Sequence, residues 1–225
     1  MEKQQVINSI KEARKGTKQR KFKQSFDFII SLRGIDLKKP EHQVDVYISL
    51  PFGKGKKPKI CTIVGPELLE NAKKSTDHVI LIDNAGSLKK NEIKNLARDY
   101  DYFIAQANIM PKVATSFGRV FGPRGKMPNP KSGGVVPPNA NLKPVYEKFQ
   151  RTVRATTKSA PLIQCGIGSE DMSVNEITDN ALTVYNAVLH ALPNEKHNIK
   201  DIYIKLTMGK PVKVGEKLEV TKETK

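Results

Sequence analysis

Cysteine, histidine and long apolar runs are scarce in this sequence, and each shortage excludes a class of function. The 225 residues include two cysteines and four histidines, and no spacing places two metal ligands on one helical face. Cys61 and Cys165 each lie in a short apolar run, which indicates buried thiols in a reducing compartment. No segment approaches the roughly 20 apolar residues of a membrane span, and the first residues lack a signal-peptide core. We therefore expect a cytoplasmic protein with no metal site and no membrane partner.

Positive charge, by contrast, is abundant. Lys and Arg number 39 against 23 Asp and Glu, which gives a net charge of +16 and a pI near 9.7. The excess is concentrated in residues 1–65, with 15 basic and 6 acidic side chains, and in residues 112–154, with 9 and 1. This charge favours a polyanionic partner such as nucleic acid, and a merely soluble basic protein is the plainer alternative.

The spacing of apolar residues predicts strands at both ends of the chain and βαβ units between them. Residues 26–32 and 44–50 alternate in polarity and are expected to form neighbouring strands after an N-terminal helix. The other expected strands are residues 60–64, 78–82, 102–105, 162–167 and 202–206. The other expected helices are residues 66–74, 88–98, 145–152 and 174–192, the last with Ser173 as its N-cap.

This order of elements predicts a two-domain α/β protein. We expect residues 1–65 and 155–225 to form a discontinuous α+β domain of sheet and helices, built from both termini. Residues 66–154 are then an inserted domain of βαβ units.

A Gly/Pro-rich basic loop is expected at residues 122–138, and its densest part is residues 122–131, GPRGKMPNPK. Prolines restrict the backbone and glycines permit positive φ, so the loop can hold Arg124, Lys126 and Lys131 in fixed directions. Such a loop either binds a phosphate backbone or only braces the hinge between two domains, and physics alone favours neither. Met127 follows Lys126, so the loop is not a nucleotide-binding P-loop.

Residues 122–131, together with Thr207-Met208-Gly209 near the C-terminus, resemble the ribosomal protein L-one family. Comparable sequence occurs over nearly the whole chain, including Lys21-Phe22, Gly34-Ile35-Asp36, Ser49-Leu50-Pro51 and Gly166-Ile167-Gly168. The resemblance implies a split first domain that carries the main RNA site and an inserted Rossmann-like second domain. It also implies binding to the stalk region of large-subunit rRNA.

The RNA site of this family uses a Lys-Phe strand start and a Thr-Met-Gly turn. Carried over to this sequence, the resemblance implies the RNA-binding residues Lys21, Phe22, Ser25, Thr207, Met208 and Gly209. A hydroxyl can pair with a 2′-OH, a thioether gives a polarizable contact, and a glycine lets RNA come close. The plainer alternatives are an ordinary strand-ending turn and an aromatic side chain in the core.

Arg154 and Lys158 are expected phosphate contacts of the first domain, with a solvated charged face as the alternative. Three departures from the bacterial pattern indicate an archaeal-type member. Lys126 stands where bacterial members carry an apolar residue, Lys210 separates Gly209 from the proline that follows, and Ser25 occupies a threonine position.

The resemblance implies a non-catalytic protein of the large ribosomal subunit, associated with the ribosome in the cytoplasm and without a cofactor. The expected partners are large-subunit rRNA, exit-site tRNA, whose release the protein would assist, and its own mRNA, whose translation it would repress. The alternative is a nucleotide-dependent RNA-modifying enzyme that uses the βαβ domain as a cofactor cradle. Asp83, at the end of an expected parallel strand, is the acid to watch in that case. The missing phosphate-binding fingerprint argues against this enzyme. A third class, a DNA-binding architectural protein, would have the same excess of positive charge.

Overall fold

The computed structural model describes residues 1–18, 20–157 and 160–215, and the chain divides into two compact units. Unit 1 comprises Met1–Lys56 and Val153–Lys225, and unit 2 comprises Lys57–Thr152. Both contain helices and strands, so the chain is of the expected mixed α/β class.

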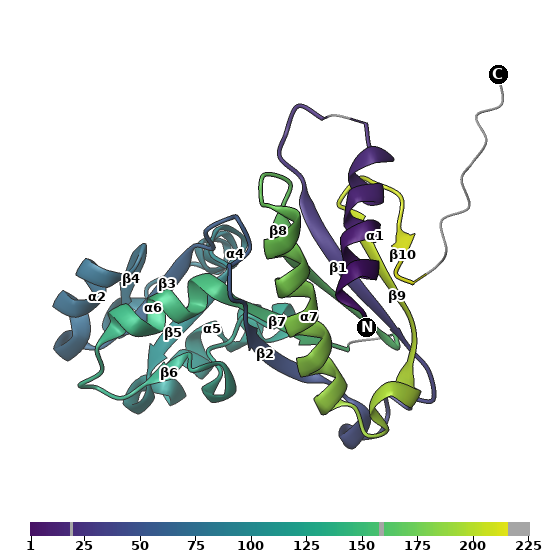
Figure 1. The fold of residues 1–225 in the computed structure, drawn as a ribbon. Helices are drawn as coiled ribbons and strands as arrows, with labels where there is room; N and C mark the ends of the chain where they lie inside the picture. The colour runs from purple at the N-terminus through teal and green to yellow at the C-terminus, as the bar shows by residue number, and fades with distance from the viewer. Residues whose placement is uncertain (19, 158–159, 216–225) are drawn as a thin grey trace. The chain divides into compact units, whose positions relative to one another are not determined.

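Unit 1 is built on an antiparallel sheet with the strand order β10-β9-β1-β8. Its elements are α1 (Lys3–Lys15), β1 (Ser25–Leu32), η1 (Pro40–His42), β2 (Asp45–Ser49), β7 (Thr152–Thr156), β8 (Leu162–Ser169), α7 (Val174–Ala191), η5 (Glu195–Asn198), β9 (Ile199–Leu206) and β10 (Val212–Lys213). Every second side chain of β1 is buried, and α1 and α7 pack against that face (Figure 1). β1 therefore lies between β8 and β9, and both of these strands come from the C-terminal part of the sequence.

The alternation in β1 and β2 is confirmed in part, but the two strands are not neighbours. β2 pairs with β7 in a separate two-stranded sheet, whereas β8 and β9 occupy both edges of β1. A two-residue period shows which face of a strand is buried and does not show which strand lies beside it. The expected pairing of these two segments was therefore wrong.

Helix α7 confirms the expected long helix and its N-cap. The backbone N–H of Glu176 donates to the Ser173 hydroxyl at 3.3 Å, and the Ser173 N–H donates to the Glu176 carboxylate at 2.9 Å. This reciprocal pair satisfies two donors that a helix start leaves open, which is worth about 1 kcal/mol.

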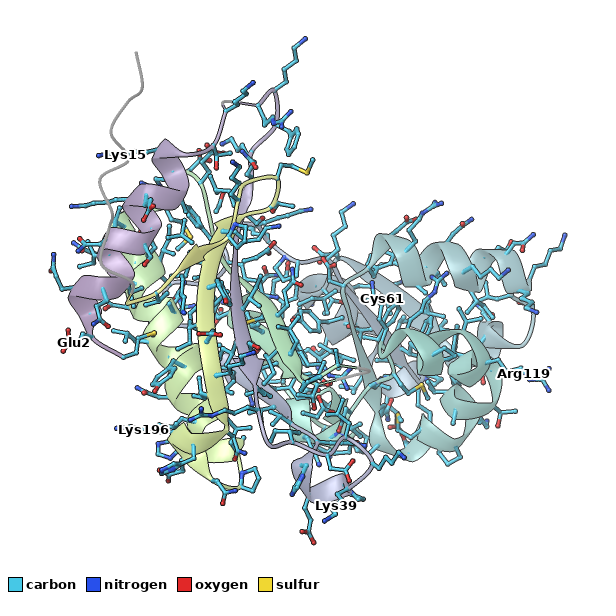
Figure 2. The ribbon with its side chains drawn as sticks, turned by 90° about the vertical axis from the view of Figure 1, so that its right-hand side faces the viewer. Glu2, Lys15, Lys39, Cys61, Arg119 and Lys196 are labelled. Carbon is cyan, nitrogen blue, oxygen red and sulfur yellow. The ribbon has the colours of Figure 1, made fainter. Side chains whose placement is uncertain are left out.

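Unit 2 is a parallel sheet with the strand order β4-β3-β5-β6. Its elements are β3 (Ile60–Val64), η2 (Pro66–Leu68), α2 (Leu69–Ser75), β4 (His78–Leu81), α3 (Ile82–Ala85), α4 (Lys90–Asp99), β5 (Tyr102–Gln106), η3 (Ala107–Ile109), α5 (Met110–Arg124), η4 (Pro130–Ser132), β6 (Val135–Val136) and α6 (Leu142–Arg151). Cys61 and Ile63 of β3 pack with α4 and α5, and the alternate residues Ile60 and Val64 pack with α2 and α6. Helices thus cover both faces of the sheet, and Cys61 lies among the side chains of its interior (Figure 2).

The unit boundaries lie at residues 56/57 and 152/153, where we expected 65/66 and 154/155. The difference is strand β3, which pairs in parallel with β4 and β5 and so belongs to unit 2.

Helix α5 was not expected, and it shortens the expected loop of residues 122–138. Val113, Phe117 and Phe121 recur every four residues and are fully buried, so they form the helix stripe that faces the sheet. The stripe includes few residues, and the glycines and proline around it hide the period. The helix continues through Arg124 and ends at Gly125, whose φ of 65° is the left-handed conformation typical of a helix C-terminus.

Candidate nucleic-acid interface

The two segments that carry most of the expected RNA-binding residues meet at one end of the unit 1 sheet. Phe26 of β1 lies opposite Leu206 of β9, so the chain before Ser25 and the turn after Leu206 are adjacent. The Thr207 backbone N–H and hydroxyl both donate to the Ser25 carbonyl oxygen, each at 3.0 Å. We call Lys21, Phe22, Ser25, Thr207, Met208 and Gly209 the β1/β9 patch.

Two large apolar side chains of the β1/β9 patch face solvent. Phe22 is 55% exposed and Met208 is 58% exposed, and Lys21 beside them is exposed as well. Because Phe22 is exposed, the alternative of a core aromatic at this position does not hold. Leaving an aromatic ring and a thioether in water forgoes the free energy of burying them. A flat ring, a polarizable sulfur and a cation form a surface on which an unpaired base can stack.

A buried glutamine, which the sequence did not reveal, fixes the turn that carries Met208. Gln24 is 1% exposed, and its side-chain oxygen accepts from the Met208 N–H at 3.1 Å. Its backbone N–H donates to the Glu170 carboxylate at 3.2 Å, and its carbonyl accepts from the Glu170 N–H at 2.9 Å. A third segment, the loop after β8, is therefore tied to the same end of the sheet.

Arg14 holds this third segment from the side of helix α1. Its guanidinium donates to the carbonyl oxygens of Glu170 and Met172 and lies over the Phe26 ring, 5.5 Å from its centroid. Asp171 in the same loop forms a 2.6 Å ion pair with Lys23, and this contact raises the pKa of Lys23. The loop thus neutralises one cation next to the β1/β9 patch and leaves its exposed apolar side chains uncovered.

Gly209 packs closely against its own chain on one side. A Cβ at this position would lie 2.5 Å from the Thr17 hydroxyl oxygen and 3.3 Å from the Leu206 Cβ. The side of Gly209 where a side chain would project therefore faces its own chain. A larger residue at this position would require the turn or the segment after α1 to shift.

Of the two expected phosphate contacts, Arg154 is not brought into the β1/β9 patch. Lys158 lies outside the described residues. Arg154 belongs to β7 in the smaller sheet, and its guanidinium donates to both carboxylate oxygens of Asp45, at 2.7 and 2.9 Å. The same group lies over the Tyr47 ring, 5.4 Å from its centroid. Asp45 neutralises this cation within unit 1.

Replacing Arg154 by alanine is expected to lower the free energy of unfolding by about 1 to 2 kcal/mol, because a half-buried bidentate pair is lost. The slope of log affinity for RNA against log salt concentration should change by less than about 0.7, the value for one phosphate contact. Urea unfolding and RNA titrations over a salt series measure the two effects, with Lys196→Ala as an exposed-cation control. A slope that flattens by 0.7 or more would instead make Arg154 a phosphate contact.

Two of the three cations in residues 122–131, Arg124 and Lys126, bind the body of unit 2. Arg124 donates to the Lys94 carbonyl at 3.0 Å, and the Lys126 ammonium donates to the Tyr100 carbonyl at 2.6 Å. Burial lowers the pKa of Lys126. Lys131 is exposed, and its backbone N–H donates to the Asn129 side chain at 2.9 Å. These bonds favour a bracing role within unit 2 for Arg124 and Lys126.

The edge of the unit 2 sheet where a nucleotide would bind is filled by the protein's own side chains. In open parallel sheets, ligands bind at the carboxyl ends of the strands. There the fully buried Gln106 of β5 accepts from the Gly65 N–H at 2.9 Å and donates to Glu67 at 3.0 Å. A phosphate bound at this edge would lie near the Glu67 carboxylate, and the two negative charges would repel each other. Asp83 is exposed on the short helix α3, and it belongs to no group of three or more potential metal ligands among the described residues.

The part of the chain that the structure describes contains neither an activated thiol nor a cluster of potential metal ligands. Burial raises the pKa of both thiols, Cys61 and Cys165, to about 12, so neither is a nucleophile near neutral pH. No group of three or more potential metal ligands occurs among the described residues. No helix in the described ranges is long and apolar enough to span a membrane.

The fold and these contacts define a basic, two-unit α/β protein whose most exposed large apolar side chains, Phe22 and Met208, lie on adjoining segments of unit 1. The model of the ribosomal protein L1p/L10e family matches residues 11–210, and the chain belongs to this family. It is 43% identical to the large ribosomal subunit protein uL1 of Nanoarchaeum equitans over 92% of this chain and 98% of that protein. It is 40% identical to uL1 of Methanocaldococcus jannaschii over 95% and 96%, and 39% identical to uL1 of Thermococcus kodakarensis over 95% and 98%.

This membership confirms the resemblance that the sequence motifs indicated, including its archaeal type. The chain is a ribosomal protein and not an enzyme, and membership also accords with the expected cytoplasmic location. The RNA-modifying alternative is thereby excluded.

Proposed function

We propose that the chain binds a folded region of large-subunit rRNA through unit 1, with the β1/β9 patch as the recognition surface. The observation that carries this proposal is the junction of residues 21–25 with the Thr207–Gly209 turn, which presents Phe22 and Met208 to solvent beside Lys21. Recognition of RNA commonly combines stacking on exposed side chains with contacts to 2′-hydroxyls and phosphates. Thr207 donates its proton to Ser25, and its oxygen still has a lone pair to accept from a 2′-OH.

Unit 1 in this proposal is the discontinuous rRNA-binding domain, and unit 2 is an inserted Rossmann-like domain that contacts exit-site tRNA. The protein assists the release of deacylated tRNA from the ribosome. The same surface of unit 1 binds an element of the protein's own mRNA and represses its translation. The family resemblance supports these roles, and the parallel sheet with helices on both faces supports the Rossmann-like description.

The test is capture of RNA from a cell lysate on the tagged full chain, followed by sequencing of the bound RNA. We expect one region of large-subunit rRNA to dominate, with a segment of the protein's own mRNA as a second product. The double variant Phe22→Ala and Met208→Ala keeps the net charge of +16 and serves as the control for binding by charge alone. Equal enrichment of all RNAs by both proteins would contradict the proposal.

A further inference from the structure

A second exposed aromatic side chain lies on a loop of unit 1 that the β1/β9 patch does not include. Phe52 follows β2 and is 49% exposed. Single exposed apolar side chains are common and need no explanation by themselves. The surroundings of Phe52 decide whether this one has a role.

The loop is held rigidly although its aromatic ring is exposed. Asn180 of α7 is fully buried, and its side chain accepts from the Phe52 N–H at 3.2 Å and donates to the Gly53 carbonyl at 2.8 Å. A third bond, from Asn180 to the Ile167 carbonyl at 2.8 Å, ties the loop to β8. Gly53 and Gly55 have φ values of 68° and 74°, a conformation that glycine adopts without strain. The backbone that carries Phe52 is thus fixed by a buried polar group.

The loop lies at the same end of the sheet as the β1/β9 patch. Ser25 at the start of β1 is paired with Ser169 at the end of β8. Gly55 packs against Ser169, since a Cβ on Gly55 would lie 2.5 Å from the Ser169 Cβ and 3.1 Å from the Met172 sulfur. Two neighbouring contacts therefore connect the loop to the segment that Gln24 and Arg14 hold in place.

The sequence on both sides of Phe52 lacks acidic residues, which suits a polyanion. Within unit 1, no acidic residue occurs in residues 46–56, and this stretch contains Lys54 and Lys56. Lys56 is exposed. Basic residues interleaved with an exposed ring are typical of sites that bind single-stranded nucleic acid, where the ring stacks on a base and the cations contact phosphates.

We propose that residues 51–56 form a second RNA-binding site, at which Phe52 stacks on an unpaired base of the rRNA and Lys56 contacts a neighbouring phosphate. This inference rests on the proposed function, because the RNA is the one bound by the β1/β9 patch. It extends the interface from the ends of β1 and β9 across the end of the neighbouring strand β8.

The test uses the full chain and the rRNA fragment that survives nuclease digestion in its complex. Phe52→Leu should weaken binding about 5-fold or more, since stacking of one base is worth about 1 to 3 kcal/mol and a factor of 5 is about 1 kcal/mol. The slope of log affinity against log salt concentration should stay unchanged in this variant, because neither side chain is charged. Phe52→Tyr keeps the ring and should restore affinity, and Lys56→Gln should flatten the slope by about 0.7 to 0.9. Hydroxyl-radical footprints should lose protection at different nucleotides in Phe52→Leu and in Phe22→Leu.

Three outcomes would overturn the inference, and they are distinguishable. Wild-type affinity in Phe52→Leu, with normal thermal melting, removes this second contact and leaves the proposed function standing. Failure of the unmodified chain to protect any rRNA fragment removes the proposed function and this site with it. Loss of affinity in both Phe52→Leu and Phe52→Tyr would point to packing of the loop and not to stacking.

Discussion

Replacing Phe22 and Met208 together by alanine is expected to lower the affinity for large-subunit rRNA about 100-fold or more. Stacking of one base on an aromatic ring is worth about 1 to 3 kcal/mol, and the thioether adds an apolar contact. A total near 3 kcal/mol corresponds to a factor of about 150 in the dissociation constant. Filter binding at one fixed salt concentration measures this loss, and a salt series should give an unchanged slope because neither side chain is charged.

The matched control is Leu162→Ala. Leu162 is another large apolar side chain on the surface of unit 1, 39% exposed, and it pairs with Ser31 near the opposite end of β1. This variant should bind RNA like the unmodified protein. Similar losses in the control and in the double variant would mean that exposed apolar area in general, and not the β1/β9 patch, determines affinity.

Gly209→Ala is expected to weaken RNA binding about 10-fold and to lower the melting temperature. The new Cβ would lie 2.5 Å from the Thr17 hydroxyl oxygen, which itself donates to the Ala13 carbonyl at 2.8 Å. Threonine is β-branched and stiff at χ1, so relief requires a shift of the turn that carries Met208. Combining Gly209→Ala with Thr17→Ala removes the contact and should restore most of the affinity.

The rescue separates two explanations for the glycine. Thermal melts and RNA titrations are compared for both single variants and for the double variant. If the double variant melts normally and still binds weakly, the RNA itself approaches residue 209, as the sequence first indicated. If Gly209→Ala alone binds and melts like the unmodified protein, the close packing against Thr17 has no functional weight.

Much of the fold could be predicted because its elements follow local patterns. Ser173 and Glu176 are three residues apart, so their capping box is readable from the sequence. Strand partners depend on contacts distant in the chain, and for that reason β1 and β2 were wrongly paired. Helix α5 escaped prediction because its buried stripe is only Val113, Phe117 and Phe121 in a segment with glycine and proline.

The candidate site divides in the same way. The family motif indicated Phe22 and Met208, and both are exposed on adjoining segments. Gln24, Glu170 and Arg14 carry no such signal, since a glutamine next to a lysine reads as a surface residue. Their bonds join residues more than 140 positions apart, from Gln24 to Glu170 and to Met208, and only the folded chain reveals them.

The position of β1 between β8 and β9 determines when the sheet of unit 1 can be completed during synthesis. This strand is made early, and both of its partners, β8 and β9, are made only after the whole of unit 2. Unit 2 is continuous in sequence and can fold as soon as it emerges, as domains generally do during synthesis. A nascent chain that stops before residue 199 displays Lys21 and Phe22 without the strand and turn that position them. On the proposed function, RNA recognition is therefore acquired in the last steps of translation, and we expect truncated products to compete poorly with the finished protein for its RNA.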